Sequence, residues 1–223
     1  RGKALQAGLY YNPDVGYIGD QIGTEGTAGE FQGMFIEQEI VTATQLGLSR
    51  AKHHHEVLEP RTEPFAHAFE IAKANGLLSV PHAGELAGPE SIWGSLNALQ
   101  ADRIGHGVRA IEDPKLMDHL KMRQTPLEIN PTSNACLNVF PNIAAHPFRK
   151  LDEYGIFVTV NSDDPPLFNT SLVQEYTVLA QQFGYDTAGL SRIARNAFVA
   201  AGVEAEIKSR LLQELDTFTQ QNQ

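Results

Sequence analysis

The sequence predicts an α/β fold in which a parallel sheet carries polar residues along one edge. Three short segments share one layout, an apolar run that turns into a polar tip bounded by glycine or proline; they are residues 80–85, 103–107 and 158–166. This layout is typical of a buried parallel strand whose C-terminal end carries functional groups. Because such ends meet at one edge of a sheet, we expect the three tips to build one shared site.

Strands and helices are expected to alternate along most of the chain. The expected strands are residues 77–81, 103–105, 127–130 and 156–161, and the expected helices among them are residues 91–99, 114–121 and 172–182. The alternation favours right-handed β-α-β units and therefore a parallel sheet. Further helices are expected at residues 65–72, stopped by Gly76, and at residues 190–198 and 203–218, which would pack on the outside of the sheet.

The first sixty residues differ from the rest because glycines punctuate them without a clear period. A short strand over residues 5–11 and a helix over residues 30–46 are expected there. His53 and His55 formally make a His-x-His pair, but polar neighbours surround them, and they precede His82 by less than one βα unit of about 30 residues. A solvated loop is the favoured interpretation, so these histidines are left out of the site.

Composition fits one globular domain over residues 1–223. The formal charge of -10 argues against a nucleic-acid surface, which needs clustered lysine and arginine. The single cysteine, Cys136, excludes an intramolecular disulfide, fits a reducing compartment and is expected to be an inert packing residue. Because the sequence contains neither a membrane-length apolar run nor a signal-peptide core after Arg1, we expect a soluble cytoplasmic protein that does not bind membranes.

Five motifs, taken in order, identify a family. They are His82-Ala83-Gly84-Glu85, then Gly88-Pro89-Glu90-Ser91-Ile92-Trp93, Arg103-Ile104-Gly105-His106-Gly107, the stretch from Glu128 to Pro131-Thr132-Ser133-Asn134, and Asn161-Ser162-Asp163-Asp164-Pro165. Together they resemble the adenosine deaminase family of the amidohydrolase superfamily. The resemblance implies a (β/α)8 TIM barrel whose later half is recognisable here, with residues 64–223 matching and residues 1–63 unmatched.

The family opens with a His-x-His pair on its first barrel strand, and no such strand is found in the sequence. We therefore expect either that these residues belong to a longer polypeptide or that they pack against another copy as a homo-oligomer. A different hypothesis is an inactive fragment or binding protein, because two metal ligands make a weak zinc site.

The resemblance assigns a role to each of the polar strand ends. His82 and Asp163 would be Zn²⁺ ligands, and a histidine nitrogen with a carboxylate oxygen suits a hydrolytic zinc site. Glu85 would be the proton shuttle beside a purine ring. His106, which stands between two glycines and so can face a small ligand, would be catalytic and orient the attacking water.

Two further residues are predicted to contact the substrate. Asp164 would act in catalysis and in substrate binding, since the prolines that follow end the strand and let both carboxylates reach one site. Gly88 is a candidate for close approach of its loop to the substrate. The segment Pro131-Thr132-Ser133-Asn134 is expected to support the site through hydrogen bonds behind the residues that contact metal and substrate.

The favoured function is zinc-dependent hydrolysis of the 6-amino group of adenosine, a purine nucleoside, to give inosine and ammonia. Another 6-aminopurine, aminodeoxyfutalosine or adenine, remains an alternative substrate. The stretch from Phe168 to Tyr176 resembles the wider deaminase group, so the resemblance defines the reaction more narrowly than the substrate.

Overall fold

The structure is a computed structural model that describes residues 62–221. These residues divide into two compact units, one of residues 62–81 with 94–101, and a larger one of residues 82–93 with 102–221. The smaller unit contains η2 (Glu63–Phe65) and α2 (Ala66–Ala74). Within it the buried Ser79 hydroxyl donates to the Leu99 carbonyl oxygen at 2.8 Å.

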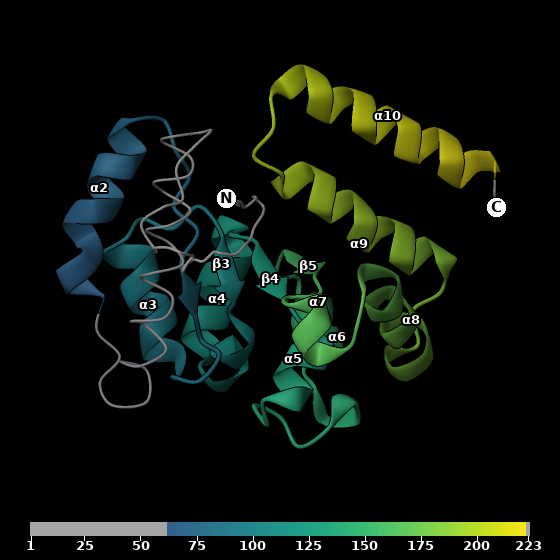
Figure 1. Ribbon diagram of the computed structural model, residues 1–223, viewed down its shortest axis with the longest axis horizontal. Helices are drawn as coiled ribbons and strands as arrows, with labels where there is room; N and C mark the ends of the chain where they lie inside the picture. Colours follow the sequence, from purple (N-terminus) through teal and green to yellow (C-terminus); the bar gives the residue numbers. More distant parts are fainter. Residues whose placement is uncertain (1–61, 222–223) are drawn as a thin grey trace. The chain divides into compact units, whose positions relative to one another are not determined.

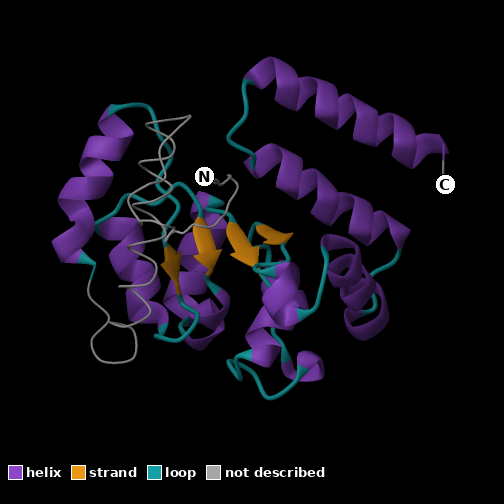
Figure 2. Cartoon of the chain, viewed as in Figure 1, coloured by secondary structure: helices purple, strands orange, loops and turns teal. Residues whose placement is uncertain are grey.

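The larger unit is built on a parallel sheet of four strands in chain order (Figure 2). The strands are β2 (His82–Ala83), β3 (Ile104–His106), β4 (Leu127–Ile129) and β5 (Val158–Val160). In this register His82 lies beside Gly105, and Ala83 lies beside His106. The parallel order, with helices after the strands, confirms the predicted α/β fold and is the repeat of a partial (β/α)8 barrel.

Helices follow each strand. In chain order they are α3 (Pro89–Asn97), η3 (Val108–Glu112), α4 (Pro114–Arg123), α5 (Pro131–Cys136), η4 (Ile143–Ala145), α6 (Phe148–Tyr154), α7 (Pro165–Phe168), α8 (Leu172–Phe183), α9 (Thr187–Ala200) and α10 (Ala205–Gln221). Four of them begin at a side-chain cap, because Asp113, Asn142, Ser171 and Asp186 accept backbone N–H donors. Gly184 ends α8 in the left-handed conformation.

The core of the larger unit lies between the strands and the helices around them. Ile104, Leu127 and Val158 of the sheet are fully buried. Helix α9 packs on β5, and Asn196 fastens it by donating to the Val158 carbonyl oxygen at 2.8 Å. Helix α10 packs on α9 in turn (Figure 1). The two terminal helices therefore lie outside the sheet, as their apolar spacing predicts.

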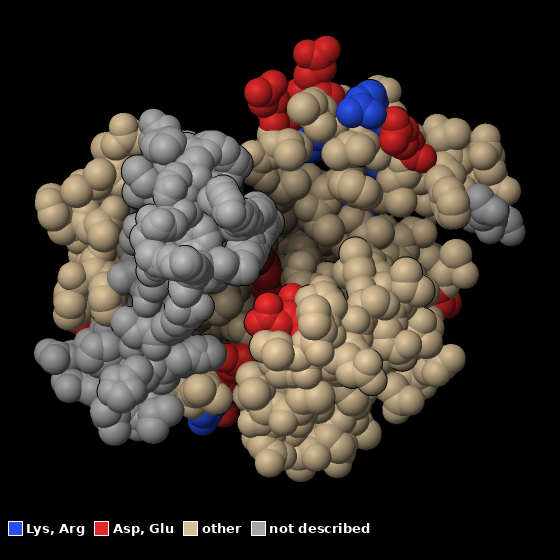
Figure 3. All heavy atoms as spheres, viewed as in Figure 1, with Lys and Arg blue, Asp and Glu red and all other residues tan. Residues whose placement is uncertain are grey.

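The surface of α10 carries mixed charge. Figure 3 shows acidic and basic side chains next to one another over this helix. Arg210 and Glu214, one turn apart, form an exposed ion pair at 3.1 Å. None of the helices between residues 62 and 221 has the length and hydropathy of a bilayer span.

Several element predictions were wrong in detail. The first expected strand, residues 77–81, lies just before β2, which begins at His82. Helices α5, α6 and α7 were not predicted, because each has seven residues or fewer and so shows little helical period. Cys136 is exposed rather than packed. The expected strand at residues 5–11, the helix at residues 30–46, and His53 and His55 all lie outside the described residues.

Candidate active site

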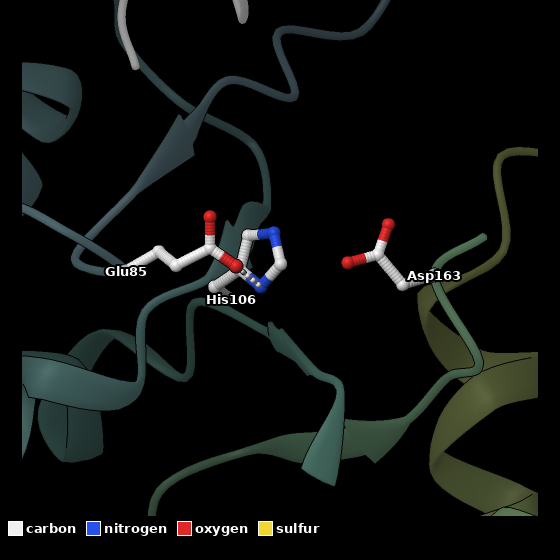
Figure 4. Close-up of side chains that lie close together, drawn as sticks. All are labelled: Glu85, His106 and Asp163. Carbon is white, nitrogen blue, oxygen red and sulfur yellow. Dashed lines mark ion pairs between the residues drawn. The ribbon is translucent and has the colours of Figure 1, made fainter. Parts of the chain in front are cut away.

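The ends of three strands bring Glu85, His106 and Asp163 together. One ligand atom from each residue lies within 4.8 Å of the other two (Figure 4). Glu85 follows β2, His106 ends β3 and Asp163 follows β5, so the polar tips meet at one edge of the sheet, as predicted. Carboxylate oxygens with an imidazole nitrogen are a donor set that fits a divalent ion such as zinc.

Glu85 and His106 form the buried part of this cluster. Glu85 Oε1 lies 3.1 Å from His106 Nδ1, and the two residues are only 2% and 3% exposed. Figure 4 shows this contact as the dashed line, with Asp163 directed toward it. Because little water reaches the pair, a proton moving between Glu85 and a ligand would be protected from exchange with bulk solvent.

The loop that carries Glu85 is fixed by its own hydrogen bonds. The buried Ser91 hydroxyl accepts from Gly84 N–H at 2.8 Å and donates to the Gly88 carbonyl oxygen at 2.9 Å. Gly84 has φ +68°, and a Cβ atom there would lie 2.3 Å from Ile92 Cδ1. Only glycine suits this conformation and this space, which explains the glycine before Glu85.

His106 and Asp163 both have left-handed backbones, with φ +67° and +59°. Such a conformation costs on the order of 1–3 kcal/mol in a residue other than glycine and persists where the surroundings enforce it. Next to His106, Gly107 N–H donates to the Ala83 carbonyl oxygen at 2.9 Å. The bond ties the end of β3 to β2 and so fixes the backbone next to His106.

Asp163 is held by the end of β4. The Ser133 hydroxyl donates to Asp163 Oδ2 at 2.6 Å. In the amide orientation that satisfies both of its polar atoms, Asn130 accepts from the Asp163 N–H at 3.1 Å. Ser133 is fully buried. The segment Pro131-Thr132-Ser133-Asn134 thus has the supporting position that was predicted for it, although it forms a helix of its own.

His82 lies beside the cluster and is not one of its three members. Its ring meets the His106 ring edge-on, with centroids 4.9 Å apart. It also covers Gly105, where a Cβ atom would lie 2.5 Å from His82 Cδ2. Position 105 therefore requires glycine, because the His82 ring of the neighbouring strand β2 occupies the space that a side chain would need. The assignment of His82 as a ligand stays a prediction.

We expect Gly105→Ala to move the His82 ring while the fold is retained. The added methyl group needs the space of Cδ2, and a ring can rotate away where a backbone cannot. If His82 is a metal ligand, zinc affinity should fall with activity, which metal analysis of the purified variant measures. Gly76→Ala adds strain at a left-handed backbone, φ +81°, but crowds nothing within 4 Å, so it controls for a loss of stability without movement of His82. Unchanged zinc affinity in Gly105→Ala would contradict a ligand role for His82.

The remaining predicted residues, Asp164 and Gly88, lie in the same loops as Asp163 and Glu85. Asp164 is exposed and is the N-cap residue of α7, with its carbonyl oxygen accepting from Leu167 N–H at 2.9 Å. Gly88 is buried, and its carbonyl oxygen is held by Ser91. Their predicted contacts with substrate stay predictions.

Sequence reasoning missed His146 and the specific role of Asn134. Asn134 Nδ2 lies 3.3 Å from Glu85 Oε1 and 3.4 Å from His106 Nδ1, and Asn134 Oδ1 lies 3.2 Å from His146 Nε2. His146 follows a short 3-10 helix and not a strand, so no apolar run marks it. The only signal was its place between Ala145 and Pro147, which does not distinguish it from a loop residue.

Comparison with known proteins assigns the family. The family model "Adenosine deaminase" matches residues 28–218. The chain belongs to the adenosine deaminase family. The match begins upstream of residue 64, where the motifs had placed the start of the likeness. It therefore also covers part of the N-terminal stretch that was expected to be unmatched.

Similar curated proteins include an aminodeoxyfutalosine deaminase and an adenine deaminase. The chain is 44% identical over 163 residues to an aminodeoxyfutalosine deaminase of Streptomyces coelicolor, covering 73% of this chain and 41% of that protein. It is 46% identical over 155 residues to an adenine deaminase of Rhizobium leguminosarum bv. trifolii, covering 70% and 48%. The chain thus spans about half the length of the curated relatives it matches.

A solved structure supports the same fold. The crystal structure of an adenine deaminase from Arthrobacter aurescens superposes with a TM-score of 0.68 at 29% identity. The superposition covers 70% of this chain and 48% of that one. The four parallel strands therefore correspond to part of an amidohydrolase barrel, as expected from the motifs.

Proposed function

We propose that the protein carrying this chain hydrolyses the amino group from carbon 6 of a purine. The observation that carries the proposal is the cluster of Glu85, His106 and Asp163 at the strand ends of a chain in this family. The reaction consumes water and the 6-aminopurine, and it yields the 6-oxopurine and ammonia. The deaminases among the relatives support this reaction class.

The proposed metal is zinc, with Asp163 and His82 as its ligands from this chain. The bound ion would supply Lewis acidity that activates a water molecule as the nucleophile. Asp163 is prepared for such a role, because the Ser133 hydroxyl orients its carboxylate and Asn130 holds its backbone N–H.

Glu85 is proposed to transfer the proton. A protonated carboxyl group that donates to a purine ring nitrogen makes the adjacent carbon more electrophilic as water attacks it, which is the role of the glutamate in zinc deaminases of another fold. Glu85 suits this task because it is buried and held in place by Asn134 and His106. His106 would orient the water and stabilise charge on the tetrahedral carbon, and Asp164 would accept a hydrogen bond from the ring.

We propose that the preferred substrate is adenine or aminodeoxyfutalosine rather than adenosine. The proposal is supported by the adenine deaminase, which is 46% identical to this chain, and by the aminodeoxyfutalosine deaminase, which is 44% identical. The test is a comparison of ammonia release from adenine, aminodeoxyfutalosine and adenosine by the purified natural protein loaded with zinc. A kcat/KM that is highest for adenosine would reverse this order.

The same assay separates the enzyme from an inactive binding protein. If the zinc-loaded natural protein releases ammonia from none of the three purines, the proposed reaction is wrong. Metal analysis accompanies the assay, because a protein that binds no zinc would instead fit the hypothesis of a site lacking part of its ligands.

A further inference from the structure

Behind Glu85 lies a chain of hydrogen bonds that begins at the main chain of α6. Phe148 N–H donates to His146 Nδ1 at 3.1 Å. His146 Nε2 lies 3.2 Å from Asn134 Oδ1, and Asn134 Nδ2 lies 3.3 Å from Glu85 Oε1. His146 is 5% exposed and Asn134 is fully buried, so water has little access to these groups.

The donor and the acceptor of each hydrogen bond in this series follow from the first bond, between Phe148 N–H and His146 Nδ1. A backbone N–H is only a donor, so His146 Nδ1 must be the acceptor and carry no proton. Burial lowers the pKa of His146 to about 3, which keeps the imidazole neutral near pH 7. A neutral imidazole without a proton on Nδ1 carries it on Nε2, and that N–H donates to Asn134 Oδ1.

The amide of Asn134 is therefore oriented by His146. With its oxygen facing His146, its NH₂ group faces Glu85 and His106. If the amide turned over, the NH₂ group would meet the N–H of His146, and its oxygen would meet the Glu85 carboxyl oxygen. Both contacts would be repulsive in the ionised state of Glu85, so the histidine selects one of the two amide orientations.

We propose that His146 is a positioning residue that sets the Asn134 amide and, through it, the Glu85 carboxyl group. The kinetic consequence rests on the proposed function, because it requires Glu85 to transfer the proton. The hydrogen-bond relay itself is a property of the folded chain. Side chains that orient a functional group in this way commonly change activity by about 10–100-fold when they are lost.

Packing around His146 provides a control that leaves the relay intact. The Phe183 ring lies 6.0 Å from the His146 ring and stacks on Phe148 at 5.9 Å. Phe183→Leu removes aromatic packing from the same pocket without removing a donor or acceptor. A role of His146 in stability alone would make this variant and His146→Leu equivalent.

The kinetic test uses the zinc-loaded natural protein, four single variants and one double variant. We expect His146→Leu to lower kcat by about 10–100-fold, with zinc content unchanged and little change in KM. His146→Gln, which retains an amide donor, should recover most of this loss, and Phe183→Leu should remain near wild type. Adding His146→Leu to Asn134→Leu should cost nothing further, because both act through one amide. The proposal would be overturned if the kcat losses of His146→Leu and Asn134→Leu were fully additive in the double variant. A loss in Phe183→Leu equal to that in His146→Leu would also overturn it.

A second readout does not depend on activity. In ¹⁵N spectra of histidine-labelled protein, His146 should show an unprotonated Nδ1 and a protonated Nε2 across about pH 5 to 8. Nδ1 protonation would overturn the relay. If the wild-type protein deaminates none of the three purines, the proposed function fails, and these spectra alone then decide whether the relay exists.

Discussion

Glu85→Gln is expected to lower kcat by about 10²–10⁴-fold, the range that general acid–base help contributes to enzyme reactions. Glutamine keeps the size and polarity of the side chain and can still accept the hydrogen bond from Asn134, but it carries no transferable proton. Folding and zinc content should therefore remain close to those of the parent. Steady-state deamination rates, a urea unfolding curve and metal analysis of the same preparation measure the three quantities.

Glu90→Gln is the matched control, since Glu90 is an exposed residue in the first turn of α3. It should leave the rate unchanged. A Glu85→Gln enzyme as fast as the parent would rule out the proton-transfer role. Loss of zinc from this variant would instead make Glu85 a metal ligand, as its place beside His106 and Asp163 in the donor cluster allows.

The parallel sheet could be predicted from sequence because each strand is an apolar run that ends in a polar tip. This pattern places β3, β4 and β5 within two residues of their observed limits. The first strand was placed too early, since residues 77–81 form the apolar run whereas the ladder to β3 begins at His82. Pairing depends on the neighbouring strand, and a propensity for extended structure does not report where the neighbour begins.

The site was predictable only in part. Residues on strand ends share an edge of the sheet, so the meeting of Glu85, His106 and Asp163 follows from topology. The contribution of His146 depends on how a loop after α5 folds back toward Asn134, and this carries no periodic signal. The sequence also does not show why residue 105 is glycine, because the His82 ring that fills the space belongs to another strand.

Asp163→Asn is expected to reduce zinc affinity by more than roughly 10–100-fold. That range is the usual cost of losing a residue that only hydrogen-bonds to a metal ligand. Asparagine keeps the size of aspartate and tolerates the left-handed backbone, here φ +59°, so the substitution mainly removes the charged oxygen. Alanine would add backbone strain to the loss of the ligand. Because zinc supplies the activated nucleophile in the proposed reaction, turnover should fall together with occupancy.

Asp164→Asn is the internal comparison, since it changes the adjacent carboxylate in the same loop. Asp164 is exposed at the start of α7, so this variant should keep its zinc and lose turnover through weaker substrate contact. Titration of both apo-variants with zinc, followed by rates at saturating metal, separates the two effects. Full zinc affinity in Asp163→Asn would show that Asp163 is not a ligand, and its bond from Ser133 would then serve to position a substrate-contacting carboxylate.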